Sequence, residues 1–121
     1  MCNPTTWLIL SLSMIVAACG GSMKYYNKAD LEVISFQGAP AGQTAILIRP
    51  MLESLYYCPG ATIRQAAGRL KVSFVRCGIK EKCIVDARAE KADPGQFRVV
   101  IAAAPETIDL VFGDGELPLA R

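Results

Sequence analysis

The segments Arg69–Cys77, RLKVSFVRC, and Cys83–Glu90, CIVDARAE, decide the fold class that we predict for this chain. In the first segment Leu70, Val72 and Phe74 recur at every second position, which is the period of a strand with one buried face. The second segment follows after a short polar stretch and carries apolar residues of its own. We therefore predict that the two segments form an antiparallel β-hairpin.

The register of this hairpin is predicted by matching faces, because a slip of one residue moves every side chain to the other face. In the preferred register Phe74 meets an alanine, whereas a shift by one residue places Asp86 opposite Phe74. The predicted loop is Ile79–Lys82. The predicted pairs are Cys77 with Ile84, Arg76 with Val85, Val75 with Asp86, Phe74 with Ala87, Val72 with Ala89 and Lys71 with Glu90.

Other short apolar runs are separated by turn-forming residues. Further strands are predicted at Leu31–Phe36, Thr44–Arg49, Gln96–Ile101 and Ile108–Phe112. The turn-forming stretches are Gly38–Gly42, Pro59–Gly60, Asp93–Gly95 and Gly113–Gly115. Short strands between regular turns predict an all-β, mainly antiparallel fold, either a small β-sandwich or a barrel.

One stretch, residues 50–57, has a pattern that also fits a helix. Pro50 suits the first position of a helix, and Leu52, Leu55 and Tyr56 have helical spacing. One short helix near residues 50–57 is therefore left open.

The start of the chain differs from the rest in charge and hydropathy. All 24 charged residues, 13 basic and 11 acidic, lie at or after Lys24. Trp7–Ala18, WLILSLSMIVAA, is apolar or small throughout. A membrane-spanning helix needs about 20 such residues, so this run is too short to span. It has the length of the hydrophobic region of a signal peptide and ends in small residues, as a cleavage site requires.

Val16-Ala17-Ala18-Cys19 resembles the lipobox of bacterial lipoproteins, in which an aliphatic residue and two small residues precede a cysteine. The resemblance implies that the Cys19 thiol receives a diacylglycerol, that cleavage occurs before Cys19, and that the freed amine takes a further acyl chain. Two or more acyl chains anchor a protein stably to a membrane. Because Gly20 is not the aspartate that favours inner-membrane retention, the resemblance implies an outer-membrane lipoprotein facing the periplasm.

The lipoprotein hypothesis divides the chain into a signal peptide (residues 1–18), a lipidated tether (19–29) and a single β domain (30–121). The residues MCNPTT at the start contain no Lys or Arg, so a weak signal or a start codon further upstream stays open. A buried N-terminal helix with an incidental Cys19 is the alternative interpretation. Gly20–Ser22 favours a tether over the continuation of a helix.

The composition excludes several classes of function. The chain of 121 residues allows one domain. Histidine is absent, which removes Ser-His-Asp and Cys-His catalysis and His-rich zinc sites. The net charge of +2 gives no electrostatic reason to expect nucleic acid as a partner. No cofactor and no metal are predicted.

Three cysteines, Cys58, Cys77 and Cys83, remain after processing, in a compartment where disulfides form. A Cys77–Cys83 bridge contributes about 2.4 kcal/mol by loop entropy and a Cys58–Cys77 bridge about 3.3 kcal/mol, so energy does not choose between them. Proximity around one loop favours Cys77–Cys83, although the predicted register places these two residues on opposite faces. A zinc cluster or a catalytic thiol is less favoured, because no C-x₂-C spacing is present.

Other polar and aromatic residues are candidates for a site, each with a plainer structural explanation. A basic patch for an anionic ligand would use Arg64, Arg69, Arg76, Arg88 and Arg98, but a solvated face neutralised by Glu90, Asp86 and their neighbours is favoured. A cation site or an acid/base pair would use Asp109, Asp114 and Glu116, but turn chemistry explains Asp114-Gly115 better. Exposed tyrosines favour interfaces, and the four tyrosines are Tyr25, Tyr26, Tyr56 and Tyr57.

Three functions are weighed on these observations. The leading hypothesis is a non-enzymatic, membrane-anchored lipoprotein of the cell envelope, whose β domain binds or scaffolds another envelope protein. The second is a periplasmic inhibitor or immunity lipoprotein, because Tyr57-Cys58-Pro59-Gly60 followed by a strand resembles C-type lysozyme inhibitor lipoproteins. The serine-glycine loop that those proteins insert into the enzyme is not found in this chain. The third is an enzyme with Cys58 as nucleophile, which needs an unusual base.

Overall fold

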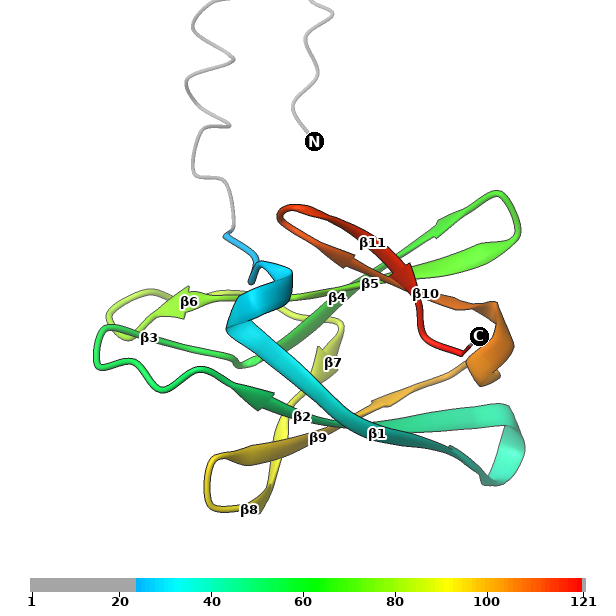
Figure 1. Ribbon diagram of the computed structural model, residues 1–121, viewed down its shortest axis with the longest axis horizontal. Coiled ribbons are helices and arrows are strands. Elements are labelled where there is room, and N and C mark those ends of the chain that lie inside the picture. Colours follow the sequence, from blue (N-terminus) through cyan, green and yellow to red (C-terminus); the bar gives the residue numbers. More distant parts are fainter. Residues whose placement is uncertain (1–23, 121) are drawn as a thin grey trace, which may run out of the picture.

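The computed structural model describes residues 24–120, which form two β-sheets packed face to face (Figure 1). In spatial order, the first sheet contains β1 (Leu31–Ala39), β2 (Gln43–Pro50), β9 (Gln96–Ile101) and β8 (Glu90–Asp93). The second contains β11 (Gly115–Pro118), β10 (Ile108–Phe112), β5 (Arg69–Phe74), β4 (Gly60–Ala66) and β7 (Ala87–Arg88). A separate pair joins β3 (Tyr56–Tyr57) to β6 (Cys77–Gly78), and short 3₁₀ turns lie at η2 (Lys28–Asp30), η3 (Pro40–Gly42) and η4 (Pro105–Thr107).

The prediction of a small, mainly antiparallel all-β sandwich is confirmed. Every named pairing is antiparallel except that between β5 and β10. The strands predicted at Gln96–Ile101 and Ile108–Phe112 occur with those bounds. The strands predicted at Leu31–Phe36 and Thr44–Arg49 extend to β1 and β2.

Alternate residues of both sheets fill the space between them. The inward residues of the first sheet include Ile46, Ile48, Val99 and Ile101, and those of the second include Val72, Phe74, Ile108 and Leu110. The rings of Phe74 and Phe112 lie with their centroids 6.4 Å apart in a tilted arrangement. Because each fully buried aliphatic or aromatic side chain contributes about 1.5–3 kcal/mol, this layer is the main source of stability.

The hairpin predicted from Arg69–Cys77 and Cys83–Glu90 is wrong, because another strand lies between its two halves. In β4, Ala61 pairs with Phe74 on one side and with Ala87 on the other. Phe74 and Ala87 thus flank the same residue, and both are buried. The face matching placed them on the same side of a sheet but missed the strand between them.

A two-residue turn explains why β4, and not the later segment, pairs with β5. Ala66 pairs with Arg69, and the two turn residues, Ala67 and Gly68, have φ values of 54° and 76°. Positive φ at both positions is the geometry of a type I′ hairpin turn, usually made by Asn-Gly or Asp-Gly. The sequence Ala-Gly carries only half of that pattern, so the turn was not expected.

The short helix left open near residues 50–57 does not form. The stretch Met51–Leu55 is irregular and leads into β3. Its backbone groups bond to other parts of the chain, since the Met51 N–H donates to the Asp30 carbonyl and the Leu55 carbonyl accepts from the Ile79 N–H. These bonds tie the irregular stretch to η2 and to the residue that follows β6.

Folded contacts begin before Asp30, the residue at which the β domain was predicted to start. Tyr26 is 1% exposed and is among the largest fully buried side chains. Its N–H donates to the Phe74 carbonyl, and its carbonyl accepts from the Gly113 N–H. Residues 24–30, which we call the N-terminal strap, therefore join the ends of β5 and β10 to the start of β1. The strap was missed because it has no strand periodicity.

No helix among residues 24–120 has the length and hydropathy needed to cross a bilayer.

Candidate binding groove

A groove of about 590 Å³ opens between the edge strands of the two sheets. One wall is β1, and the other is formed by β10, β11 and the residue that follows β11. The residues that line it are Lys28, Leu31, Glu32, Val33, Ile34, Ser35, Phe36, Leu110, Phe112, Leu117, Pro118 and Leu119. The floor is apolar, because Leu31, Leu110 and Phe112 are buried core residues. The hydrophobic core thus comes close to the surface at this edge.

The strand β1 leaves its outer edge unpaired within the described part of the chain. It is nine residues long, and Glu32 is its one charged residue. Its pairing with β2 shifts between Val33 and Ser35, so that Ile34 is the extra residue of a bulge, and Ile34 lines the groove. Unpaired main-chain N–H and C=O groups beside an apolar groove suit an added extended chain.

The opposite wall is less able to add a strand. The outermost strand there, β11, has four residues and ends at Pro118, which has no N–H to donate. An extended chain in the groove would therefore pair with β1 and pack against β11 through side chains alone. None of the residues that line the groove was predicted from the sequence to be part of a binding site. The signal that could have found them is a long strand, Leu31–Ala39, with a single charged residue.

Two of the five basic candidates, Arg76 and Arg69, lie in separate ion pairs. Arg76 binds Glu53 through both carboxylate oxygens, at 2.6 to 3.2 Å, and its guanidinium lies 3.9 Å from the centroid of the Tyr56 ring. The hydrogen bonds from Arg76 lower the pKa of Glu53. Arg69 makes two hydrogen bonds to Asp109, at 2.8 and 2.9 Å.

Two of the acidic candidates, Asp109 and Glu116, lie near each other, but a lysine lies between their carboxylates. Lys71 bridges Asp109 and Glu116 with bonds of 2.8 and 2.9 Å. Hydrogen bonds from Arg69 and Lys71 hold the pKa of Asp109 far below its usual range. Asp114 is not with them, because its side chain accepts a hydrogen bond from the N–H of Lys28 in the strap. These carboxylates are occupied in structural contacts and form no shared cation site.

Neither Glu90 nor Asp86, two of the acidic residues expected to neutralise the basic face, takes part in an ion pair among residues 24–120. The carboxylate of Asp86 accepts a 2.7 Å hydrogen bond from the N–H of Ile63 at the edge of β4. Glu90 pairs with Arg98 in the register of β8 and β9, but the ion pairs of residues 24–120 do not include it. Asp86 therefore satisfies a main-chain N–H group of another strand, a role that the number of charged residues in the sequence could not indicate.

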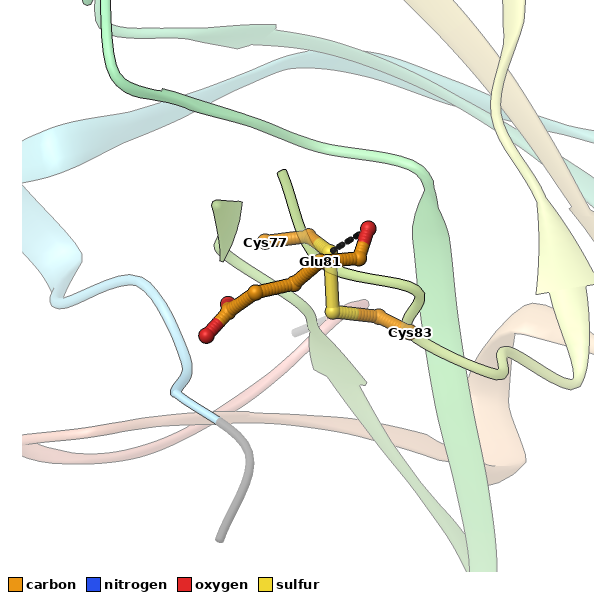
Figure 2. A group of neighbouring side chains, drawn as sticks. All are labelled: Cys77, Glu81 and Cys83. Carbon is orange, nitrogen blue, oxygen red and sulfur yellow. Dashed lines mark hydrogen bonds between the residues drawn. A yellow bond between two sulfur atoms is a disulfide. The ribbon is translucent and has the colours of Figure 1, made fainter. Parts of the chain in front are cut away.

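The predicted disulfide between Cys77 and Cys83 is present, with the two Cα atoms 6.1 Å apart. The face conflict disappears because the two cysteines do not belong to one ladder. Glu81 lies beside them (Figure 2), and its carboxylate accepts a hydrogen bond from the Gly78 N–H. The two sulfurs and the carboxylate lie within 4.8 Å of one another, but disulfide sulfurs carry no thiolate and cannot bind zinc as cysteines do.

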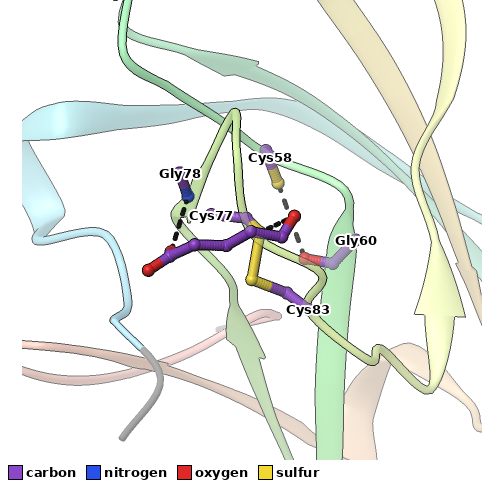
Figure 3. The surroundings of a disulfide bond; sticks show 6 residues. Cys58, Gly60, Cys77, Gly78 and Cys83 are labelled. Carbon is purple, nitrogen blue, oxygen red and sulfur yellow. Dashed lines mark hydrogen bonds between the residues drawn. A yellow bond between two sulfur atoms is a disulfide. The ribbon is translucent and has the colours of Figure 1, made fainter. Parts of the chain in front are cut away.

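The remaining thiol, Cys58, is buried near that disulfide (Figure 3). Its Sγ lies 3.5 Å from the carbonyl oxygen of Gly60, to which it donates a weak hydrogen bond. Burial raises the pKa of the thiol to about 12. A thiol that stays protonated at neutral pH is a poor nucleophile.

The tetrapeptide Tyr57-Cys58-Pro59-Gly60 lies where β3 leads into β4, as the expected strand requires. Tyr57 is exposed, whereas Gly60 is packed so closely on β7 that a Cβ atom there would overlap the Ala87 carbonyl oxygen. The lipobox and Cys19 lie outside the described residues. Comparison of the chain with protein-family profiles, with curated proteins and with solved structures gives no match.

Proposed function

We propose that this protein is a lipid-anchored, non-enzymatic binding module of the bacterial cell envelope, and that it holds an extended segment of another envelope protein in the groove beside β1. The observation that carries the binding part is the groove of about 590 Å³ next to the free edge of a nine-residue strand. The anchor part rests on the lipobox that ends at Cys19.

The shape and chemistry of the groove support an extended protein chain as ligand. Main-chain hydrogen bonds to an edge strand give affinity, and side-chain pockets give specificity. The bulge at Ile34 and the half-exposed ring of Phe36 offer apolar contacts, and Lys28 and Glu32 offer charges of both signs at one end. The ligand expected is therefore an extended segment with alternating apolar residues.

Two of the side chains that an enzyme would use as a nucleophile or as an acid are buried or held in ion pairs, which agrees with a binding role. The Cys58 thiol is buried and has a raised pKa, and Asp109 is held in ion pairs with Arg69 and Lys71. Alkylation checks this point. With the disulfide intact at pH 8, we expect Cys58 to react with iodoacetamide only after denaturation. Rapid reaction of the folded protein would favour the cysteine enzyme instead.

The anchor is tested by replacing the lipidated residue. We expect the wild-type chain to fractionate with membranes and Cys19→Ala to be found in the soluble fraction, with a different electrophoretic mobility. Membrane association and processing that are unchanged in Cys19→Ala would contradict the lipoprotein hypothesis.

The groove is tested by photo-crosslinking in cells that make the protein. A photoreactive amino acid is placed at Ser35, an exposed residue that lines the groove, and at Val100, which is 41% exposed on β9 and outside it. A discrete protein adduct from position 35, and none from position 100, is the expected result. If mass spectrometry identifies the captured protein as a cell-wall hydrolase, the inhibitor or immunity function is the one supported.

A further inference from the structure

The large exposed apolar side chains of the domain are concentrated in two neighbouring segments, 51–57 and 77–84, which we call the β3–β6 lobe. Four of them are Leu52, Leu55, Ile79 and Ile84, which are 96%, 65%, 56% and 82% exposed. The pairing of β3 with β6 and the bond from the Ile79 N–H to the Leu55 carbonyl join the two segments. Figure 1 shows β3 and β6 together at one end of the molecule.

The lobe is held in place, so its apolar side chains cannot easily turn inward. The Cys77–Cys83 disulfide closes the second segment. Arg76, which directly precedes β6, holds Glu53 of the first segment in a bidentate ion pair. A fixed, exposed apolar surface marks a protein or membrane contact more often than a defect of folding.

The chain enters the domain at the base of this lobe. The Lys24 carbonyl accepts a hydrogen bond from the Arg76 N–H, and the Lys24 ammonium donates to the hydroxyl of Tyr56, 3.0 Å away. Cys19 precedes Lys24 by five residues, and five extended residues span at most about 18 Å. A lipid on Cys19 therefore keeps the base of the lobe within about 18 Å of the bilayer surface.

The charges around the lobe also suit a membrane. Lys80 and Lys82 are exposed and take part in none of the ion pairs found among residues 24–120. Glu53 is neutralised by Arg76, and the Glu81 carboxylate accepts from the Gly78 N–H. Apolar side chains next to free lysines are the pattern of surfaces that lie at the headgroup boundary of anionic bilayers.

We infer that the β3–β6 lobe rests on the membrane that carries the lipid anchor, with Leu52, Leu55 and Ile79 at the acyl boundary and Lys80 and Lys82 among anionic headgroups. This inference rests on the anchor part of the proposed function. It gives the domain a fixed orientation on the bilayer, where a long tether would leave it free to turn.

A single tryptophan tests the inference, because the one tryptophan of the chain, Trp7, lies in the segment removed before Cys19. Leu55→Trp and the matched control Val100→Trp are made in the full chain, and each lipidated protein is purified and reconstituted into phosphatidylglycerol/phosphatidylethanolamine vesicles with brominated acyl chains. Position 55 should be quenched at least threefold more strongly than position 100, with a blue-shifted emission. Lys80→Glu combined with Lys82→Glu should reduce the quenching at position 55.

Three other outcomes would contradict the contact between the lobe and the membrane. They distinguish failure of that contact from failure of the lipid anchor. Equal, weak quenching at both positions in protein that sediments with the vesicles overturns the lobe contact, while the anchor stands. Protection of position 55 by an envelope protein and not by vesicles overturns it in favour of a protein partner. Protein that fails to sediment, with no lipid on Cys19 by mass spectrometry, overturns the anchor and the inference together.

Discussion

The two edge strands of the first sheet, β8 and β1, differ greatly in how well they are protected from pairing with another chain. We call the edge at β8 the guarded side and the edge at β1 the open side. The strand β8, Glu90–Asp93, has four residues, of which Glu90, Lys91 and Asp93 are charged, and its pairing with β9 shifts before Asp93. The strand β1 at the other edge has nine residues and one charge. Short length, charge and irregular register are the usual means by which proteins keep edge strands from pairing with other chains.

The difference shows where a second chain can add to this sandwich. At the guarded side the chain itself passes from β7 in one sheet to β8 in the other through Ala89, whose N–H donates to the Pro59 carbonyl. At the open side the N-terminal strap leads from the second sheet into the start of β1, and the groove lies beyond it, between β1 and β11. The proposed binding of another chain rests on this long, sparsely charged edge beside a groove.

A substitution in the N-terminal strap, which borders the open side, should reduce the stability of the domain more than the other changes below. Tyr26→Ala removes a fully buried ring from the core, so we expect a loss of about 3–5 kcal/mol in the free energy of unfolding. Urea denaturation measures it. Tyr26→Phe is the control: the buried hydroxyl finds no hydrogen-bond partner among the described residues, so its removal should leave stability equal or higher. A large loss in Tyr26→Phe would show that the hydroxyl has a partner.

A pair of glycines compares the two sides directly. At the guarded side Gly60→Ala would drive a Cβ atom into the Ala87 carbonyl, so we expect a loss of about 2–3 kcal/mol. At the open side Gly38 in β1 has no atom within 4 Å of an added Cβ, and Gly38→Ala should change stability by less than about 0.5 kcal/mol. Thermal unfolding of both variants tests the contrast, and similar losses would remove it.

The two cysteines of the disulfide do not line the groove, so its loss should leave binding at the open side intact. Cys77→Ser should lower the free energy of unfolding by about 2 kcal/mol, because the closed loop is short and restrains the unfolded chain weakly. The expected result is a lower melting temperature with an unchanged adduct from position 35. Loss of the adduct in a folded variant would place the binding surface near the lobe.

Lowering the pH should weaken the ion pairs that hold β11, one wall of the groove. This is the smallest of the effects that we expect. The folded pKa of Asp109 is lowered by hydrogen bonds from Arg69 and Lys71, and Lys71 also binds Glu116 of β11. The stabilisation from a carboxyl with a lowered pKa is complete above the unfolded value of about 3.9 and is lost as the pH falls through the folded value. Melting temperatures from pH 5 to pH 2 should therefore fall less steeply in Asp109→Asn than in the wild type.

The sequence predicted the class of the fold and several strands because alternation and turn residues are local properties. The strand Ile108–Phe112 could be bounded from its own residues. Its parallel pairing with β5 could not be predicted, because pairing across about 40 residues depends on which strand edges remain free after the local hairpins form. The Ala67-Gly68 turn decided that β5 pairs with β4, and its left-handed alanine carries no sequence signal.

The site was harder to predict than the fold. The predicted candidates were charged, sulfur-bearing and aromatic residues, and most of them serve structural roles, as Asp114 does in binding the strap. The groove is instead lined by ordinary apolar residues such as Val33 and Leu117, which come together only because two sheet edges lie apart. Cys77 and Cys83 were predictable because loop closure is local.

The central claim, that the open side beside β1 holds another protein chain, is tested most directly by two matched substitutions. Phe36 and Val100 are exposed to similar extents, 37% and 41%, but only Phe36 lines the groove. With the photoreactive residue at position 35, Phe36→Asp should reduce the protein adduct at least tenfold, and Val100→Asp should leave it unchanged. Equal adduct yields in both variants, at equal protein levels, would contradict the claim.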